Sequence, residues 1–217
     1  MQRAIRYLYY LVCAAGLGVL VSQGSAGQDK GFVDLFNGKD LSGWKFIPDN
    51  ATKTFTVEND YIKVSGKPNG YFYTDKSYKN YVLKFDWRYK RPADLEDDNK
   101  FNGNSGLLVH ITGPHKVWPT CLEVQGMNKT HASFIPIGGK AVGLTDYKFD
   151  KDTLNKVRNK VGEWNTTEVS VKNGEVTAKV NGTPISSGKI TLTEGPFGFQ
   201  SEGAELHFKN IKIKVLN

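Results

Sequence analysis

Polar side chains that can transfer protons or bind hydroxyl groups occupy alternate positions within apolar segments of this 217-residue chain. In residues 121–125, Leu122 and Val124 point to one face of an extended strand, so Glu123 and Gln125 point to the other. Glu123 is therefore our candidate for a general base or a metal ligand. The alternative is a carboxylate that pairs with an arginine or lysine of a neighbouring strand, which contributes little when exposed.

The same alternation identifies a histidine and an arginine. His110 lies between apolar positions of residues 107–111, and a histidine can act as acid or base because its reference pKa is near ~6.5. Arg88 can bind an anionic oxygen or a hydroxyl group with its planar guanidinium. The alternatives are a hydrogen-bonded sheet histidine and an ion pair of Arg88 with Asp86 or Glu123.

A second set of residues offers hydrogen bonds or an aromatic surface to a ligand. The candidate substrate-binding residues are Asp86, Asn104, Gln125, Gln200 and Trp118. If the strands belong to one sheet, Asp86, Gln125 and Gln200 share one polar face with Glu123, His110 and Arg88. Trp118 lies in a proline-flanked loop and suits stacking on a sugar ring, whereas Trp44 is expected in the core. An ordinary solvated sheet face is the alternative.

The elements that position these residues are predicted to be strands. Residues 81–89 alternate apolar and polar side chains, as do 167–172, 175–180 and 205–215. Asn173-Gly174 and Asn181-Gly182 predict tight hairpins, because both residue types tolerate positive φ. Helical periodicity is confined to residues 151–160, which are expected to form a short helix or a loop. The pattern predicts an all-β sandwich or barrel.

Three stretches without periodicity are expected to be loops, namely residues 91–103, 112–120 and 126–165. Long loops on a rigid scaffold often carry binding groups. The first contains Asp94, Glu96, Asp97 and Asp98. We expect either a solvated run of charges or a Ca²⁺ site there, although the spacing does not fit an EF-hand loop. The sequence identifies no other cofactor.

The composition restricts the class of partner. The net charge of +7 comes from 29 basic and 22 acidic residues. The lysines are scattered singly between strand residues instead of forming a basic stripe, which argues against nucleic-acid binding. The sequence implies no particular oligomeric state.

The first residues are typical of a bacterial signal peptide. Arg3 and Arg6 precede an apolar segment at 11–21, and Gly24–Ala26 forms a small-residue cleavage site. We expect residues 1–26 to be removed, leaving a single β-sandwich domain at 27–217 with no membrane span, in the periplasm or on the cell surface. An uncleaved anchor is the alternative. The mature chain then keeps only Cys121, which excludes an internal disulfide and a structural zinc site of cysteines.

Six segments, taken in order, resemble one family. They are FVDLFNGKDLSGW (32–44), NSGLL (104–108), EVQ (123–125), GEWN (162–165), GPFGFQSEG (195–203) and FKNI (208–211). The set is similar to the 3-keto-disaccharide hydrolase domain, also described as a 3-keto-glucoside lyase/hydratase domain. The resemblance implies a concanavalin-like jelly-roll sandwich of two antiparallel sheets, in exported bacterial proteins that act on oxidised sugars.

The resemblance also implies a reaction. A ketone at sugar C3 acidifies the C2 hydrogen, so a base can remove it, form an enolate and expel the C1 substituent, after which water can add. Such a site needs a base, an acid and a positive group near the enolate oxygen. We expect Glu123, His110 and Arg88 in these roles. The alternatives are a noncatalytic carbohydrate-binding module with the same fold and a domain that binds a partner protein through an apolar patch.

Overall fold

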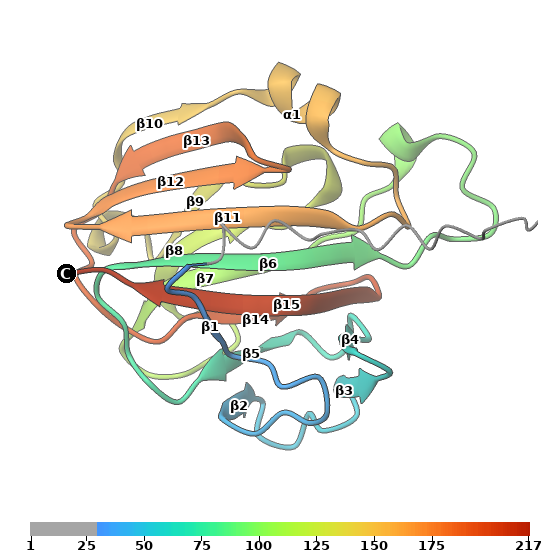
Figure 1. The fold of residues 1–217 in the computed structure, drawn as a ribbon, viewed down its shortest axis with the longest axis horizontal. Coiled ribbons are helices and arrows are strands. Elements are labelled where there is room, and N and C mark those ends of the chain that lie inside the picture. Colours follow the sequence, from blue (N-terminus) through green and yellow to red (C-terminus); the bar gives the residue numbers. More distant parts are fainter. Residues whose placement is uncertain (1–29) are drawn as a thin grey trace, which may run out of the picture. The chain divides into compact units, whose positions relative to one another are not determined.

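The computed structural model describes residues 30–217, so the predicted signal peptide at 1–26 lies outside the described residues. Residues 31–217 form one compact unit. This unit is almost entirely β-structure in two antiparallel sheets, the arrangement expected of a jelly-roll sandwich (Figure 1).

The strands of the large sheet come from both ends and the middle of the chain. They are β1 (Val33–Asp34), β3 (Phe55–Glu58), β4 (Tyr61–Val64), β6 (Tyr81–Tyr89), β10 (Thr145–Phe149), β11 (Asn165–Lys172), β12 (Glu175–Val180), β13 (Thr183–Lys189) and β15 (Leu206–Val215). Their spatial order is β10-β13-β12-β11-β6-β15-β4-β3, and β1 also pairs with β15 (Figure 1). The central strand β6 therefore lies between β11 and β15.

The small sheet has six strands. They are β2 (Trp44–Ile47), β5 (Gly70–Thr74), β7 (Gly106–Thr112), β8 (Thr120–Gln125), β9 (Phe134–Ile137) and β14 (Gly198–Ser201). Their order is β2-β5-β14-β7-β8-β9, so β14 and β7, which are distant in sequence, are neighbours. This pairing places the NSG and GFQ segments of the sequence side by side.

The core fills the space between the two sheets. The rings of Phe85 from β6 and Phe199 from β14 meet edge to face with centroids 4.9 Å apart. Trp44 is buried against Phe72, at 5.0 Å between centroids, so its expected place in the core is confirmed. Edge-to-face contacts of this kind contribute beyond the apolar area that they bury.

The predicted hairpins are confirmed in detail. Asn173 and Gly174 have φ of 51° and 82°, and Asn181 and Gly182 have φ of 48° and 83°. The flanking pairs Lys172–Glu175 and Val180–Thr183 show that each turn has two residues. Positive φ at both positions matches the twist of the adjoining strands.

The long stretch at residues 126–165 differs from the expected loop. It contains β9 at the edge of the small sheet and β10 at the edge of the large one. It also holds the short helix α1 (Lys151–Val157), where Asp150 caps the first turn by accepting a hydrogen bond from the backbone of Thr153 at 2.9 Å. Edge strands are short and partly exposed, so their sequences lack the regular alternation of central strands.

Single 3₁₀ turns lie at Asp98–Lys100, Asn128–Thr130 and Gly139–Ala141. Among the described residues, no helix has the length and apolar character needed to cross a membrane.

Candidate functional site

Glu123 lies on the face of the small sheet that points away from the core. In β8 its neighbours Leu122 and Val124 belong to the core between the sheets, as the sequence predicted. Glu123 pairs with Leu108 of β7 on one side and with Ile135 of β9 on the other. Its side chain is only 5% exposed, so this carboxyl group is held among apolar neighbours instead of in bulk water.

A glycine leaves room for the side chains of Glu123 and Gln200 to meet. A Cβ atom at Gly106 would lie 2.3 Å from Oε1 of Glu123 and 2.6 Å from Oε1 of Gln200. The carboxyl and the amide therefore both extend over this glycine, from strands on either side of β7. Within residues 30–217, Oε1 of Glu123 and both amide atoms of Gln200 are buried without a hydrogen-bond partner. Buried polar atoms without partners are rare in proteins, so each needs an explanation, such as a catalytic role or a bound water or ion.

Substituting alanine for Gly106 is expected to disrupt this arrangement. The new methyl group would overlap both the carboxyl of Glu123 and the amide of Gln200. Forcing such groups apart in a packed site typically costs about 1–3 kcal/mol. We therefore expect a lower urea midpoint, together with loss of any activity that needs Glu123. Gly182→Ala creates no such crowding, because nothing lies within 4 Å of its Cβ position; its φ of 83° strains an alanine, so it is expected to lower the urea midpoint without loss of activity.

A second carboxylate completes the site. Glu202 follows Gln200 by two positions and is half-buried on the same face, where Asn104 forms bridges with Glu202 and Gly203. Burial raises the pKa of Glu202, and a hydrogen bond from Asn104 opposes that rise. The side-chain Oδ1 of Asn104 has no partner among the described residues. Two carboxyl groups and two amides thus gather around Gly106.

Burial, together with the negative charge of Glu202, raises the pKa of Glu123 to about 8 from its ordinary value of 4.5. Desolvation disfavours the ionised form of a carboxyl group, and a nearby like charge adds to that effect. Glu123 is consequently protonated for much of the time at neutral pH. A carboxyl group with a pKa near the working pH is suited to both taking and giving a proton.

An aromatic cluster lies on the same face, across β14 from Glu123. The hydroxyl of Tyr71 and Nδ1 of His115 are 3.1 Å apart, and the His115 ring stacks on Tyr73 with centroids 4.4 Å apart. His115 is exposed in the loop between β7 and β8. Trp118 belongs to the same loop and is 42% exposed, so its proposed stacking on a sugar stays a prediction.

His110 does not lie on this face, contrary to the expectation. It has φ of 51° at a bulge in the pairing of β7 with β8, and its neighbour Ile111 joins the cluster of Tyr71 and Cys121 on the outer face. The imidazole is 1% exposed, meets the core ring of Tyr81 edge to face, and places Nδ1 3.1 Å from the carbonyl of Leu192. A bulge reverses the alternation beyond it. The expected pairing of His110 with Glu123 is therefore wrong.

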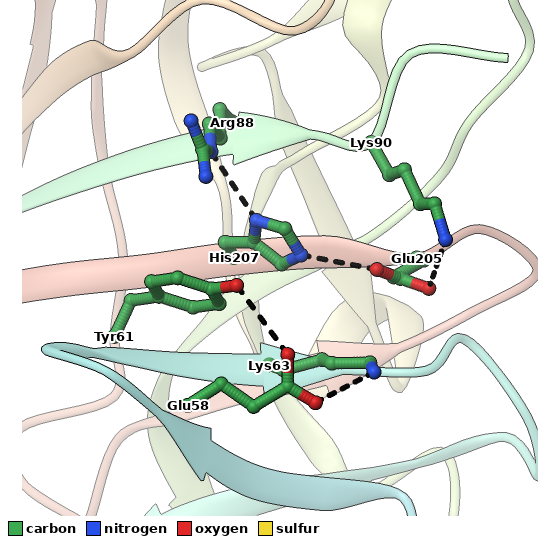
Figure 2. A network of polar contacts seen from close by, with 7 residues as sticks. All are labelled: Glu58, Tyr61, Lys63, Arg88, Lys90, Glu205 and His207. Carbon is green, nitrogen blue, oxygen red and sulfur yellow. Dashed lines mark hydrogen bonds and ion pairs between the residues drawn. The ribbon is translucent and has the colours of Figure 1, made fainter. Parts of the chain in front are cut away.

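Arg88 and Asp86 belong to the other sheet. They project from β6 on the outer face of the large sheet, where Arg88 pairs with His207 of β15 (Figure 2). Asp86 accepts hydrogen bonds from Thr166 at 2.6 Å and Asn210 at 2.7 Å. Glu123 lies on β8 of the small sheet, so the two layers of the sandwich separate it from both residues. The prediction of one shared polar face is wrong for Arg88 and Asp86 as well.

The remaining predicted residues keep to the face of Glu123. Gln200 and Asn104 adjoin the carboxyl groups, whereas the side-chain oxygen of Gln125 accepts a hydrogen bond from the backbone of Met127 at 2.9 Å. Sequence reasoning missed Glu202, although alternation in residues 197–203 places it on the same face as Gln200. It also missed Gly106, whose importance depends on the neighbouring strands.

Two of the four carboxylates of the acidic loop are used in hydrogen bonds within the protein. Asp98 accepts hydrogen bonds from Arg91 at 2.6 Å and from the backbone of Val161 at 2.7 Å, and Asp97 caps the 3₁₀ turn that follows. In the part of the chain that is described, no group of three or more histidine, cysteine, aspartate or glutamate side chains is arranged to hold a metal ion.

A hollow of about 590 Å³ lies elsewhere, on β10, β12 and β13 of the large sheet. Its walls carry the exposed ion pair of Lys189 and Asp146, at 3.1 Å, and no buried unpartnered group. This shallow hollow is large, but it lacks the convergent polar groups of a binding site. We therefore assign the candidate site to the carboxyl groups around Gly106.

Comparison with known proteins gives a consistent family. Residues 31–214 match the family model described as a 3-keto-alpha-glucoside-1,2-lyase-like domain. A 3-keto-disaccharide hydrolase from Bacteroides thetaiotaomicron is 21% identical over 240 residues, covering 86% of this chain and 79% of the relative.

Solved structures agree on the fold. A candidate glycosyl hydrolase from Parabacteroides distasonis has a TM-score of 0.63 at 28% identity, covering 86% of this chain and 94% of the other. A second one from the same organism has a TM-score of 0.62 at 19% identity, with 85% and 99% covered. A carbohydrate-binding module from Bacillus subtilis reaches 0.56 at 12% identity, with 79% and 95% covered. At such identities the last two support the architecture alone.

Proposed function

Because the chain belongs to the family of 3-keto-alpha-glucoside-1,2-lyase-like domains, which suggests a carbohydrate-active function, we propose that it cleaves 3-keto-glycosides. The observation that carries this proposal is the buried carboxyl of Glu123, which extends over Gly106 beside the unpartnered amide of Gln200. We further propose that the enzyme is exported to the periplasm or the cell surface, on the basis of the signal-like residues 1–26.

In the proposed reaction the carboxylate of Glu123 removes the proton from C2 of the oxidised sugar. The electron pair of the C2–H bond forms an enolate with the C3 ketone and then expels the substituent at C1. The amide of Gln200 donates a hydrogen bond to the C3 oxygen as negative charge develops there. A donor placed toward developing charge in a site without water stabilises the transition state strongly.

The leaving group needs a proton, and Glu202 is the proposed donor. Burial raises the pKa of Glu202, which favours the protonated form that can act as an acid. The elimination products are an unsaturated 3-keto sugar and the free alcohol. Addition of water across the new double bond, with the C2 proton returned by Glu123, would complete a net hydrolysis. Arg88 and His110 have no role in this reaction, since neither lies on this face.

The test is release of the alcohol from an aryl 3-keto-glucoside, offered in both anomeric configurations. Hydroxide also removes the acidic C2 proton, so the enzyme-free rate is subtracted at each pH. We expect kcat/KM to rise as Glu123, with a pKa of about 8, ionises, and to fall again as Glu202, the proposed acid, loses its proton. Absence of release above the blank with both anomers at every pH contradicts the proposal.

A noncatalytic carbohydrate-binding module is the second candidate. The stacked rings of His115 and Tyr73 and the exposed Trp118 on the same side of the small sheet favour sugar binding as such. Binding of the unoxidised glucoside by calorimetry, without release of alcohol from its 3-keto form, would support the module over the enzyme. The unpartnered carboxyl of Glu123 favours the enzyme, because a binding surface gains little from an unpaired buried acid.

A further inference from the structure

Arg88, on the outer face of the large sheet, is held in place through Nε and the plane of its guanidinium, while its two terminal nitrogens are left without hydrogen bonds to the described residues. Nε of Arg88 donates a hydrogen bond to Nδ1 of His207 at 3.2 Å (Figure 2). The guanidinium carbon lies 4.5 Å from the ring centroid of Trp164 and 5.6 Å from that of Tyr61. Among residues 30–217, neither terminal nitrogen of Arg88 makes a hydrogen bond, and no carboxylate lies within 4.0 Å of them.

The support behind Arg88 fixes its orientation. Since Nδ1 of His207 accepts from Arg88, the ring proton belongs on Nε2, which lies 3.1 Å from Oε1 of Glu205. The other oxygen of Glu205 binds Lys90 at 3.3 Å. Tyr61 stacks on the His207 ring with centroids 4.4 Å apart, and burial lowers the pKa of His207, which favours its neutral form. A side chain fixed in this way loses little further freedom when it binds a ligand.

The neighbouring carboxylates do not balance the positive charge of Arg88. Glu58 is matched by Lys63 at 2.7 Å, and Glu205 is matched by Lys90 at 3.3 Å (Figure 2). Lys209 adds another cation, with Nζ 4.4 Å from the centroid of Trp164 and a long contact of 4.0 Å to Asp60. The two glutamates are therefore already occupied, and an added anion would meet unmatched positive charge at Arg88.

We propose that Arg88, seated on Trp164, binds the carboxylate of an acidic sugar at a second site, on the sheet opposite Glu123. The planar guanidinium presents two parallel N–H groups that match the two oxygens of a carboxylate, and Lys209 contributes a second positive charge beside the same tryptophan. The choice of a sugar, over another carboxylate, rests on the carbohydrate role proposed above. The site itself is independent of Glu123.

Titration with glucuronate tests the proposal, followed by calorimetry and by tryptophan fluorescence, because the ligand would sit beside Trp164. We expect saturable binding that weakens with added salt, and no binding of glucose at the same concentrations. Arg88→Gln is expected to weaken binding about tenfold or more, as loss of a charge-assisted pair does. Arg88→Lys is expected to weaken it too, because an ammonium group keeps the charge but loses the parallel N–H groups.

Two control variants show whether glucuronate binding depends on Arg88 in particular. Lys172→Gln removes one charge at the far end of the same sheet and is expected to leave glucuronate binding unchanged. Glu123→Gln is expected to leave it unchanged as well, which distinguishes this proposal from the catalytic one. Equal affinity in the wild type and Arg88→Gln, or no saturable binding of glucuronate, overturns the proposal. Acetate binding as tightly as glucuronate overturns the assignment to an acidic sugar.

Discussion

Glu123→Gln is expected to reduce kcat/KM for a 3-keto-glycoside by about 10²- to 10⁴-fold, the range that a positioned general base contributes. Glutamine has nearly the same shape as glutamate, so it can occupy the space over Gly106 without displacing Gln200. It cannot accept the C2 proton. The loss should appear in kcat, because the carboxylate is needed for the chemical step and not for holding the sugar.

The measurement compares initial rates of alcohol release for the wild type, Glu123→Gln and Glu175→Gln. Glu175 is exposed on β12 of the large sheet, so its substitution removes a carboxylate without touching the site. Circular dichroism and the urea midpoint check that each variant is folded. Turnover by Glu123→Gln within a few-fold of wild type would show that another group removes the proton, and Glu202 would then be the next residue to substitute.

The same substitution is expected to change how the free energy of unfolding depends on pH. In the folded protein the pKa of Glu123 is about 8, whereas the unfolded chain should have a value near its ordinary 4.5. The native state therefore binds more protons between these values, and the stability from the neutral carboxyl is full below pH 4.5 and lost as pH rises to about 8. Glutamine does not titrate in this range. The free energy of unfolding of the variant should therefore rise relative to that of the wild type by up to about 4 kcal/mol over this interval.

Urea unfolding followed by tryptophan fluorescence at pH 5, 6.5 and 8 gives the comparison. Burial also raises the pKa of Glu202, so the free energy of unfolding of both proteins depends on pH for this second reason. The difference in free energy of unfolding between wild type and Glu123→Gln is therefore the informative quantity. Glu175→Gln should follow the wild type. Parallel curves for wild type and Glu123→Gln would mean that the carboxyl of Glu123 ionises as readily in the folded chain as in the unfolded one.

These two expectations have one physical origin. The apolar neighbours Leu108 and Ile135 exclude water from the carboxyl, and no described group donates a hydrogen bond to its Oε1. That isolation costs stability when the carboxyl ionises, and it makes the carboxylate a stronger base. If the pH-dependent loss of stability is found without catalysis, the site still contains a destabilised acid, and its purpose would have to be ligand binding.

The sequence by itself determined the local structure. Alternation in residues 81–89 predicted β6, and the paired Asn-Gly turns predicted the hairpins that join β11, β12 and β13. It also placed Glu123 correctly on the face away from the core, because Leu122 and Val124 had to be buried. The ordered motifs gave the family. The strand and turn signals are local, since side chains of one strand alternate with a period of two whatever the rest of the chain does.

Only the tertiary structure decided which residues share a face. Trp87 of β6 pairs with Asn165 and with Phe208, partners far away in the sequence, and these pairings put Arg88 on the large sheet. A bulge at His110 turned its side chain into the core. Alternation tells which way a side chain points relative to its own strand, but sheet membership and bulges depend on long-range pairing and packing. The meeting of Glu123 and Gln200 over Gly106 was decided in the same way.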